Sequence, residues 1–301
     1  MTRLSRLFPA VAVALFALCG FTLQAQDWAK PMLEKSSRHR EYVLVTSGGR
    51  TINTFVVYPE VKGKAPVVVL IHEIFGLSDW LKVQADELAA KGFIVVVPDL
   101  TSGTDALFAA GGQEAVVKGV TSLPDEQVMA DLDAVSDYGK KLPSANGKLF
   151  VAGFCWGGGK SFAFATHRMD LNAAFVFYGS APAAADMAKI NVPVYGFYGE
   201  NDARIGATVP QAVTDMKAAG KVFAPVTYAG AGHGFMRGGQ DPAAKPADKK
   251  AFDEGFERLV KLLKSNSMGT KKMSSGAKSK GSHRAVSSAA AMDCSAMHGA
   301  V

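Results

Sequence analysis

Cys155 is the residue of this chain best suited to act as a nucleophile. It stands at the centre of residues 153–157, which read Gly-Phe-Cys-Trp-Gly and follow an apolar, strand-like run. A nucleophile at the tip of a strand-to-helix turn has a strained backbone, and glycines on either side leave room for the neighbouring chain. The positive end of the following helix favours the thiolate over the thiol. A cysteine between aromatic residues is more commonly a small buried hydrophobe, so this motif needs support from other segments.

Asp202 and His233 supply that support. Asp202 ends the segment Gly-Glu-Asn-Asp at 199–202, and His233 lies in Gly-Ala-Gly-His-Gly-Phe at 230–235; each segment directly follows a strand-like run. The order nucleophile, acid, base is the chain order of the α/β-hydrolase triad. His233 would take the thiol proton and later activate water, while Asp202 would orient the imidazole and stabilise its charged form. The sequence therefore predicts a catalytic triad rather than three unrelated residues.

The loop after the first buried strand is predicted to complete the site. Residues 72–76 read His-Glu-Ile-Phe-Gly and follow a continuous apolar run. In the α/β-hydrolase arrangement a backbone N–H from this loop joins the N–H of the residue after the nucleophile. Here these groups belong to Ile74 and Trp156, which would bind the negative oxygen of a tetrahedral intermediate.

Strands must bring these distant segments together. Runs at 41–46 and 51–58 flank a Gly-Gly turn and predict an antiparallel hairpin. Six further strand-like runs follow at 66–72, 93–98, 148–153, 173–178, 192–198 and 222–228. Helical periodicity falls at about 78–90, 125–141, 156–167, 207–219 and 247–264. The pattern predicts an α/β-hydrolase fold, with an eight-stranded, mostly parallel sheet, helices on both faces, and a ligand site at the carboxyl ends of the strands.

The two ends of the chain differ from this body. Residues 1–25 combine two arginines, an apolar run and a final small residue, which is typical of a cleaved export signal. A lipoprotein signal would use Cys19, but the preceding Leu18 is larger than such sites require. Residues 265–301 are rich in Ser, Ala, Gly and Lys and predict a flexible, low-complexity tail. We expect one α/β-hydrolase domain at 26–264, a periplasmic or secreted location, and no stable membrane span after cleavage.

The net charge of +6 does not indicate a basic binding surface. Two arginines lie in residues 1–25, and residues 265–301 hold five basic residues and one acidic residue, so the body keeps 26 of the 33 basic and 26 of the 27 acidic residues. Nucleic acid binding is therefore not supported. We expect neither a cofactor nor a metal, because the chain has no Gly-x-Gly-x-x-Gly loop and no paired metal ligands. Cys155 is the only thiol of the body, and a bridge to Cys294 stays open.

As a set, the segments at 72–76, 153–158, 199–202 and 232–237 resemble the dienelactone hydrolases, or carboxymethylenebutenolidases. The resemblance spans nearly the whole body and implies the triad of Cys155, His233 and Asp202. It gives Glu73 the place of a carboxylate that contacts the resting thiol and helps to produce the thiolate. It also implies that arginines bind a substrate carboxylate. Arg237 matches one of them, but the segment after the fourth strand has no second arginine, which puts dienelactone itself in question.

The sequence thus predicts an exported hydrolase that cleaves an ester or lactone of a small organic acid through a thioester on Cys155. Phe75, Trp156 and Phe235 are expected to wall the pocket, although aromatic residues there could equally pack in the core. Two other classes of function stay open. One is an exported thiol redox protein, and the other is a non-catalytic protein that binds a ligand on a hydrolase scaffold. The natural substrate and the oligomeric state do not follow from these patterns.

Overall fold

The computed structural model of the chain describes residues 27–103 and 105–268. The predicted export signal and residues 269–301 of the predicted tail lie outside the described residues, so both stay predictions. Within the described part, no helix is long and apolar enough to cross a bilayer.

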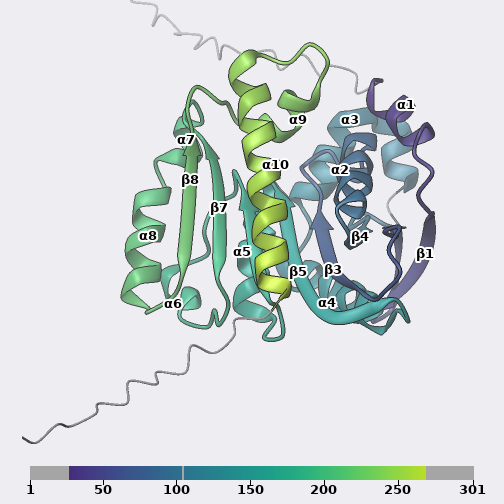
Figure 1. Cartoon of the computed structure of the whole chain (residues 1–301), viewed down its shortest axis with the longest axis horizontal. Helices are drawn as coiled ribbons and strands as arrows, with labels where there is room; N and C mark the ends of the chain where they lie inside the picture. The colour runs from purple at the N-terminus through teal and green to yellow at the C-terminus, as the bar shows by residue number, and fades with distance from the viewer. Residues whose placement is uncertain (1–26, 104, 269–301) are drawn as a thin grey trace, which may run out of the picture. The chain divides into compact units, whose positions relative to one another are not determined.

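The described chain forms one eight-stranded sheet with the order β1-β2-β4-β3-β5-β6-β7-β8. Strands β1 and β2 pair antiparallel, as do β2 and β4, and the other pairs are parallel (Figure 1). This confirms the α/β-hydrolase fold predicted from the sequence. The strands are β1 (Arg40–Ser47), β2 (Arg50–Val57), β3 (Ala65–Ile71), β4 (Ile94–Pro98), β5 (Ala145–Phe154), β6 (Ala173–Phe177), β7 (Val194–Gly199) and β8 (Phe223–Tyr228).

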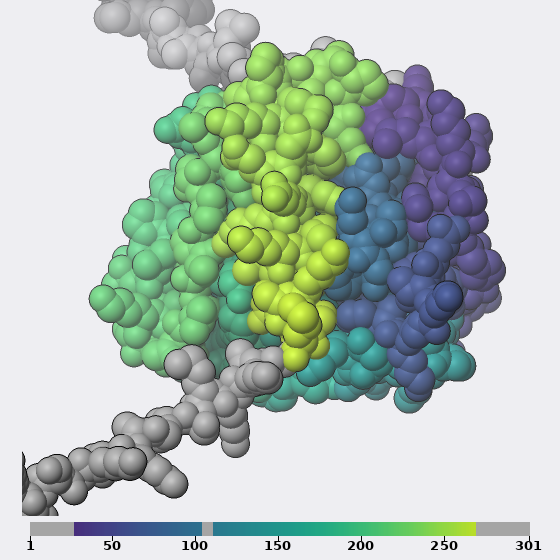
Figure 2. Space-filling view, viewed as in Figure 1, coloured from purple at the N-terminus to yellow at the C-terminus, as the bar shows by residue number. Residues whose placement is uncertain are grey.

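Helices cover both faces of the sheet. The longer ones are α2 (Asp79–Ala90), α3 (Asp105–Thr121), α4 (Asp125–Lys141), α5 (Trp156–His167), α8 (Val209–Ala218) and α10 (Pro246–Ser267). The shorter ones are α1 (Ala29–Glu34), α6 (Ala184–Met187), α7 (Ala203–Gly206) and α9 (Phe235–Gln240). In Figure 1, α10 stands in front of the sheet, and its side chains form the centre of the same face in Figure 2.

The continuous apolar strands explain these two layers. Successive side chains of a strand point to opposite faces, so β3 contributes Val68 and Leu70 to one core and Val67 and Val69 to the other. The first core includes apolar residues of α1, α2 and α10, and the second includes those of α4, α5 and α8. The central strands β3, β4 and β6 are buried on both sides, as expected for a parallel sheet with helices on each face, while the edge strands β1 and β8 are partly exposed.

The structure adds helices that the periodicity did not predict. Helix α3 occupies the segment between the fourth strand and residue 125, where no helix was predicted, and it contains a break at Gly112, with φ 58° and ψ −150°. The last helix continues to Ser267, three residues beyond the predicted end at 264. Glycines interrupt the apolar pattern of α3, which explains why a search for helical periodicity misses this element.

Candidate active site

The predicted nucleophile sits on a strained turn between β5 and α5. Cys155 has φ 54° and ψ −115°, a conformation that residues other than glycine rarely adopt. The flanking glycines are required by close backbone contacts. A Cβ on Gly153 would lie 2.0 Å from the carbonyl oxygen of Gly157, and a Cβ on Gly157 would lie 2.4 Å from that of His72. This geometry is that of a nucleophile elbow.

The structure brings the three residues of the predicted triad together. The Nε2 atom of His233 lies 3.2 Å from the Sγ atom of Cys155, and its Nδ1 atom lies 2.5 Å from Oδ2 of Asp202. A carboxylate accepts, so Nδ1 donates and leaves the Nε2 lone pair facing the thiol. Asp202 is only 6% exposed, while the His233 side chain is 32% exposed. The imidazole is thereby oriented to take the thiol proton.

Contact between two turns places Asp202 beside His233. The turn after β7 packs so closely on the turn after β8 that a Cβ on Gly199 would lie 2.6 Å from the carbonyl oxygens of Ala231 and Gly232. The backbone N–H of Asn201 donates to the carbonyl of Ala231 at 2.8 Å. Asp202 also begins α7, where its side chain accepts a hydrogen bond from the N–H of Ile205 at 3.4 Å. The acid is therefore held on a rigid turn.

The surroundings of Cys155 favour the neutral form of its thiol. Burial and the nearby charge of Glu73 raise the pKa of Cys155 to about 11. The backbone N–H groups of Trp156 and Ile74 face the sulfur and lower the pKa of Cys155, as does the positive charge of Arg204. The amides at the helix start favour the thiolate, as expected, and burial and Glu73 favour the neutral thiol more strongly. These two amides, of Ile74 and Trp156, are the groups predicted to form the oxyanion site.

Glu73 is buried, with 4% of its surface exposed, at the carboxyl end of β3. Its Oε2 atom accepts a hydrogen bond from Nε of Arg237 at 2.8 Å, and its Oε1 atom accepts one from the Tyr178 hydroxyl at 3.3 Å. In the described part of the chain its partners are these two residues and not the thiol. Glu73 thus acts on Cys155 through its charge.

The three residues expected to bind substrate differ in their placement. The guanidinium of Arg237 lies over the ring of Phe75, 5.1 Å from its centre, while it also holds Glu73. Phe235 is only 1% exposed and packs edge-on against Tyr178, with ring centres 5.4 Å apart. Phe235 therefore lies in the core behind Tyr178 rather than in the pocket wall. In this conformation Arg237 is occupied by an ion pair.

A pocket of about 530 Å³ opens beside the nucleophile. It is lined by Ile74, Asp125, Cys155, Trp156, Gly159, Lys160, Ala163, Thr166, Tyr178, Ser180, Ala181, Pro182, Ala183, Asp186, Arg204 and Ile205. Lys160 pairs with Asp125, and Asp186 pairs with Lys189. Arg204 is exposed and has no ion-pair partner within residues 27–103 and 105–268. It is therefore the cation of this pocket that is available to a ligand.

Sequence reasoning missed two residues of this site. Tyr178 follows β6, has a positive φ of 40°, and packs edge-on against the His233 ring with 5.0 Å between ring centres. Arg204 lies two residues after the triad acid. The position of Tyr178 at a strand end was the available signal, because the other site residues also follow strands. In the residues that the structure describes, no cluster of three or more His, Cys, Asp or Glu side chains could hold a metal ion.

Comparisons with known proteins show the family of this chain. The model of the dienelactone hydrolase family matches residues 52–267. A Salmonella typhimurium protein named "Putative carboxymethylenebutenolidase" is 30% identical over 234 residues, which cover 72% of this chain and 83% of that protein. A protein of the same name from Methylorubrum extorquens is 32% identical over 197 residues, which cover 61% of this chain and 68% of that protein.

Solved structures show the same fold. A crystal structure titled "Putative Dienelactone Hydrolase" from Klebsiella pneumoniae has a TM-score of 0.66 and 25% identity, with 76% of this chain and 99% of that chain covered. A dienelactone hydrolase-like promiscuous phosphotriesterase from metagenomic libraries has a TM-score of 0.65 and 22% identity, with the same coverage, and supports the fold alone. With the family model matching most of its length, this chain is an α/β-hydrolase that belongs to the dienelactone hydrolase family.

Proposed function

We propose that this protein hydrolyses an ester or lactone of a small organic acid through a thioester on Cys155. The observation that carries the proposal is the alignment of sulfur, imidazole and carboxylate. Nε2 of His233 lies 3.2 Å from Sγ, and Nδ1 lies 2.5 Å from Asp202. This is the arrangement of a nucleophile, a base and a group that orients the base.

The reaction proceeds in two halves. His233 takes the proton of the Cys155 thiol as the sulfur attacks the substrate carbonyl. The carbonyl oxygen becomes negative and is bound by the N–H groups of Ile74 and Trp156. His233 then gives its proton to the departing alcohol oxygen, which leaves a thioester. Water, deprotonated by His233, attacks the thioester and releases the acid, and the proton returns to the sulfur.

The electrostatics of the thiol favour hydrolysis over redox chemistry. Redox-active cysteines have low pKa values, because the thiolate is the species that oxidants attack. Burial and Glu73 instead raise the pKa of Cys155 to about 11. The thiol is therefore protonated until a base adjacent to it removes the proton, which suits a nucleophile that is activated only during attack. A purely ligand-binding protein has no need of an oriented base beside a thiol.

The pocket supports a small substrate that carries a negative charge. Its volume of about 530 Å³ suits a small organic acid and its alcohol. Arg204 presents an exposed guanidinium at the wall of this pocket, and its charge acts on the sulfur. A carboxylate on the substrate is the partner that a free arginine prefers. The names of the relatives are consistent with a lactone as the substrate.

Residues 1–25 have the pattern of an export signal, which supports an exported location for the protein.

Turnover of aryl esters and small lactones by the full chain tests the proposal. The wild type, Cys155→Ala and Cys294→Ala form a matched set, because each variant removes one thiol. We expect Cys155→Ala to lower kcat by about 10⁴-fold or more and Cys294→Ala to leave it unchanged. Equal activity of Cys155→Ala and the wild type would refute the proposal.

A further inference from the structure

His72 is a buried histidine that the proposed reaction does not use directly. It follows β3 and is fully buried. Its Nδ1 atom lies 2.8 Å from the carbonyl oxygen of Glu73. A carbonyl can only accept a hydrogen bond, so Nδ1 carries the hydrogen. Burial lowers the pKa of the imidazole, which keeps the ring neutral and leaves Nε2 without a hydrogen. Nε2 has no hydrogen-bond partner in the described structure.

The carbonyl that His72 holds belongs to the peptide group that carries the N–H of Ile74. A peptide group is planar, and in its trans form the C=O and N–H bonds point in opposite directions. The described chain has no cis peptide bond. The carbonyl oxygen of Glu73 also accepts a hydrogen bond from the N–H of Gly76 at 3.2 Å. The imidazole and this backbone turn therefore hold the oxygen of Glu73 together, and holding it at one end of the plane fixes the direction of the Ile74 N–H at the other end. That N–H faces the sulfur of Cys155.

The same imidazole also stacks on the side chain of Trp156, whose backbone N–H is the second predicted oxyanion donor. The rings of His72 and Trp156 stack nearly parallel, with 5.4 Å between centres and 10° between planes. The backbone of His72 lies against the elbow as well, since a Cβ on Gly157 would come within 2.4 Å of its carbonyl oxygen. One buried imidazole therefore lies between the loop that carries Ile74 and the helix start that carries Trp156.

We propose that His72 is a positioning residue that aims the Ile74 N–H at the oxyanion of the tetrahedral intermediate. The inference rests on the proposed thioester mechanism. Donation to the Glu73 carbonyl also polarises the peptide and strengthens its N–H as a donor. Packing alone does not account for an imidazole at this place, because a buried nitrogen without a partner costs free energy that an apolar side chain would not.

Kinetics of variants test the role of the Nδ1 hydrogen bond. In the full chain, His72→Leu removes the donor, and His72→Asn keeps an N–H close to the position of Nδ1. His167→Leu is the matched control, because His167 is also stacked on an aromatic ring, that of Phe164, but lies on the surface. We expect His72→Leu to lower kcat by about 10-fold to 100-fold and to change KM by less than about twofold, because the donor acts only on the transition state.

Recovery of kcat in a conservative variant distinguishes a positioning role of His72 from a general disturbance of the fold. His72→Asn is expected to regain most of the lost kcat, and His167→Leu to match the wild type. A trifluoromethyl ketone that adds to the thiol should lose affinity in His72→Leu by the same factor as kcat, while the product acid should bind as before. An unchanged kcat in His72→Leu, or His72→Asn as slow as His72→Leu, would overturn the inference.

A measurement on the wild type covers the case in which the variants fail to fold. Nitrogen-15 NMR of the His72 ring should show hydrogen on Nδ1 and none on Nε2 from about pH 6 to 9. A charged ring, or hydrogen on Nε2, would overturn the inference without reference to any variant. If the wild type shows this tautomer but hydrolyses no ester in a Cys155-dependent way, the proposed function fails while the hydrogen bond to Glu73 stands.

Discussion

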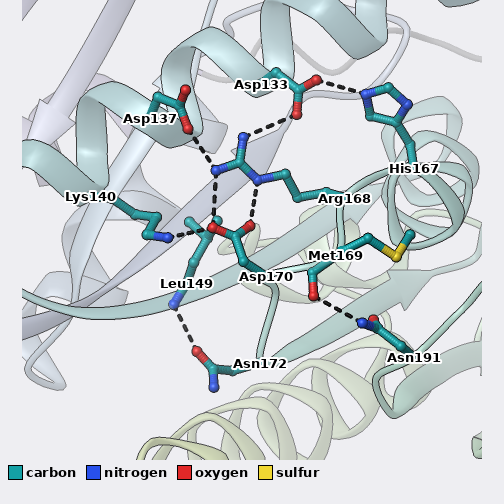
Figure 3. A network of polar contacts seen from close by, with 10 residues as sticks. All are labelled: Asp133, Asp137, Lys140, Leu149, His167, Arg168, Met169, Asp170, Asn172 and Asn191. Atoms are coloured by element: carbon teal, nitrogen blue, oxygen red, sulfur yellow. Dashed lines mark hydrogen bonds and ion pairs between the residues drawn. The ribbon is translucent and has the colours of Figure 1, made fainter.

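Two clusters of the molecule contain the same kinds of side chain and do different things. In the candidate active site, His233 pairs with Asp202 at 2.5 Å and Arg237 pairs with Glu73 at 2.8 Å. Around Arg168, shown in Figure 3, His167 pairs with Asp133 at 2.6 Å, and the guanidinium contacts three aspartates. The aspartates of this surface cluster are Asp133, Asp137 and Asp170.

Their places in the fold separate the two clusters. The active-site carboxylates follow β3 and β7 at the carboxyl ends of the strands, and both are nearly inaccessible to water. The surface cluster joins α4 to the turn between α5 and β6, at the amino end of β6, and the Asp137 side chain is 52% exposed. A His–Asp pair alone therefore does not mark a catalytic site. What marks it is a buried acid and a second ring nitrogen that faces a nucleophile.

The largest expected contrast is between the two His–Asp pairs. His233→Ala should lower kcat for ester hydrolysis by about 10⁴-fold and Asp202→Asn by about 10²-fold to 10⁴-fold, because the base or its orientation is lost. The matched surface variants, His167→Ala and Asp133→Asn, should stay within about twofold of the wild type in the same assay. An equal loss of activity in the variants of both pairs would contradict the claim that only the active-site pair takes part in catalysis.

The next largest difference is expected between removing a negative charge from the active site, at Glu73, and removing one from the surface cluster. Its charge helps to raise the pKa of Cys155, so Glu73→Gln should lower that pKa below about 11. Below the pKa, the thiolate fraction grows about tenfold for each unit by which the pKa falls. Alkylation of Cys155 by iodoacetamide at pH 8 should therefore accelerate in Glu73→Gln. Asp137→Asn removes the same charge from the surface cluster and should not change the rate. A slower alkylation in Glu73→Gln would mean that Glu73 lowers the pKa of Cys155 instead of raising it.

Arg204 should affect substrate choice more than rate. Arg204→Gln is expected to lower kcat/KM about fivefold to tenfold for an aryl ester that carries a carboxylate, and to leave a neutral ester of equal length unchanged. The effect should shrink in 0.5 M salt, because the guanidinium is exposed. Lys217→Gln on α8 is the control, since Lys217 is an exposed cation outside the pocket. If both variants lose the preference for the carboxylate-bearing ester, the net charge of the protein attracts the anion, and not Arg204 in particular.

The surface cluster should contribute to stability and not to turnover. Its hydrogen bonds to Arg168 and Lys140 lower the pKa of Asp170 from 3.8 to about 2. Because the folded-state pKa is the lower one, the stabilisation is complete above pH 4 and is lost as the pH falls toward 2. Asp170→Asn should therefore unfold about 0.5–1 kcal/mol more easily in urea at pH 7, a small value because the side chain is 42% exposed. The difference should vanish near pH 2, and kcat should not change.

Apolar strands and the groups that follow them were predictable from the sequence. Each buried run of Val, Ile and Phe is long enough to identify its strand. Cys155 and Asp202 each follow such a run, and His233 follows the partly exposed strand β8. The carboxyl ends of parallel strands meet at one edge, so their convergence could be expected before the fold was known. Helix α3 could not be predicted in this way, because Gly111 and Gly112 interrupt its periodicity.

The finer properties of the site depend on neighbours that no local pattern specifies. The protonation of Cys155 follows from burial and the Glu73 charge against two backbone amides, a balance that only the folded geometry sets. Phe235 is buried against Tyr178, a residue far from it in the sequence. The role proposed for His72 depends on its hydrogen bond to the carbonyl oxygen of Glu73. Arg204 lies beside the pocket because α7 begins at the triad acid.

Mass spectrometry of the acyl-enzyme tests the proposed mechanism most directly. A slowly hydrolysed aryl ester is mixed with the wild-type chain, the reaction is quenched in acid within the first turnover, and the peptides are mapped. The predicted result is an acyl group on Cys155 that forms at the rate of the aryl alcohol burst and disappears on addition of hydroxylamine. Turnover with an acyl group on another residue, or with no acyl group on Cys155 at any time, would contradict the thioester mechanism.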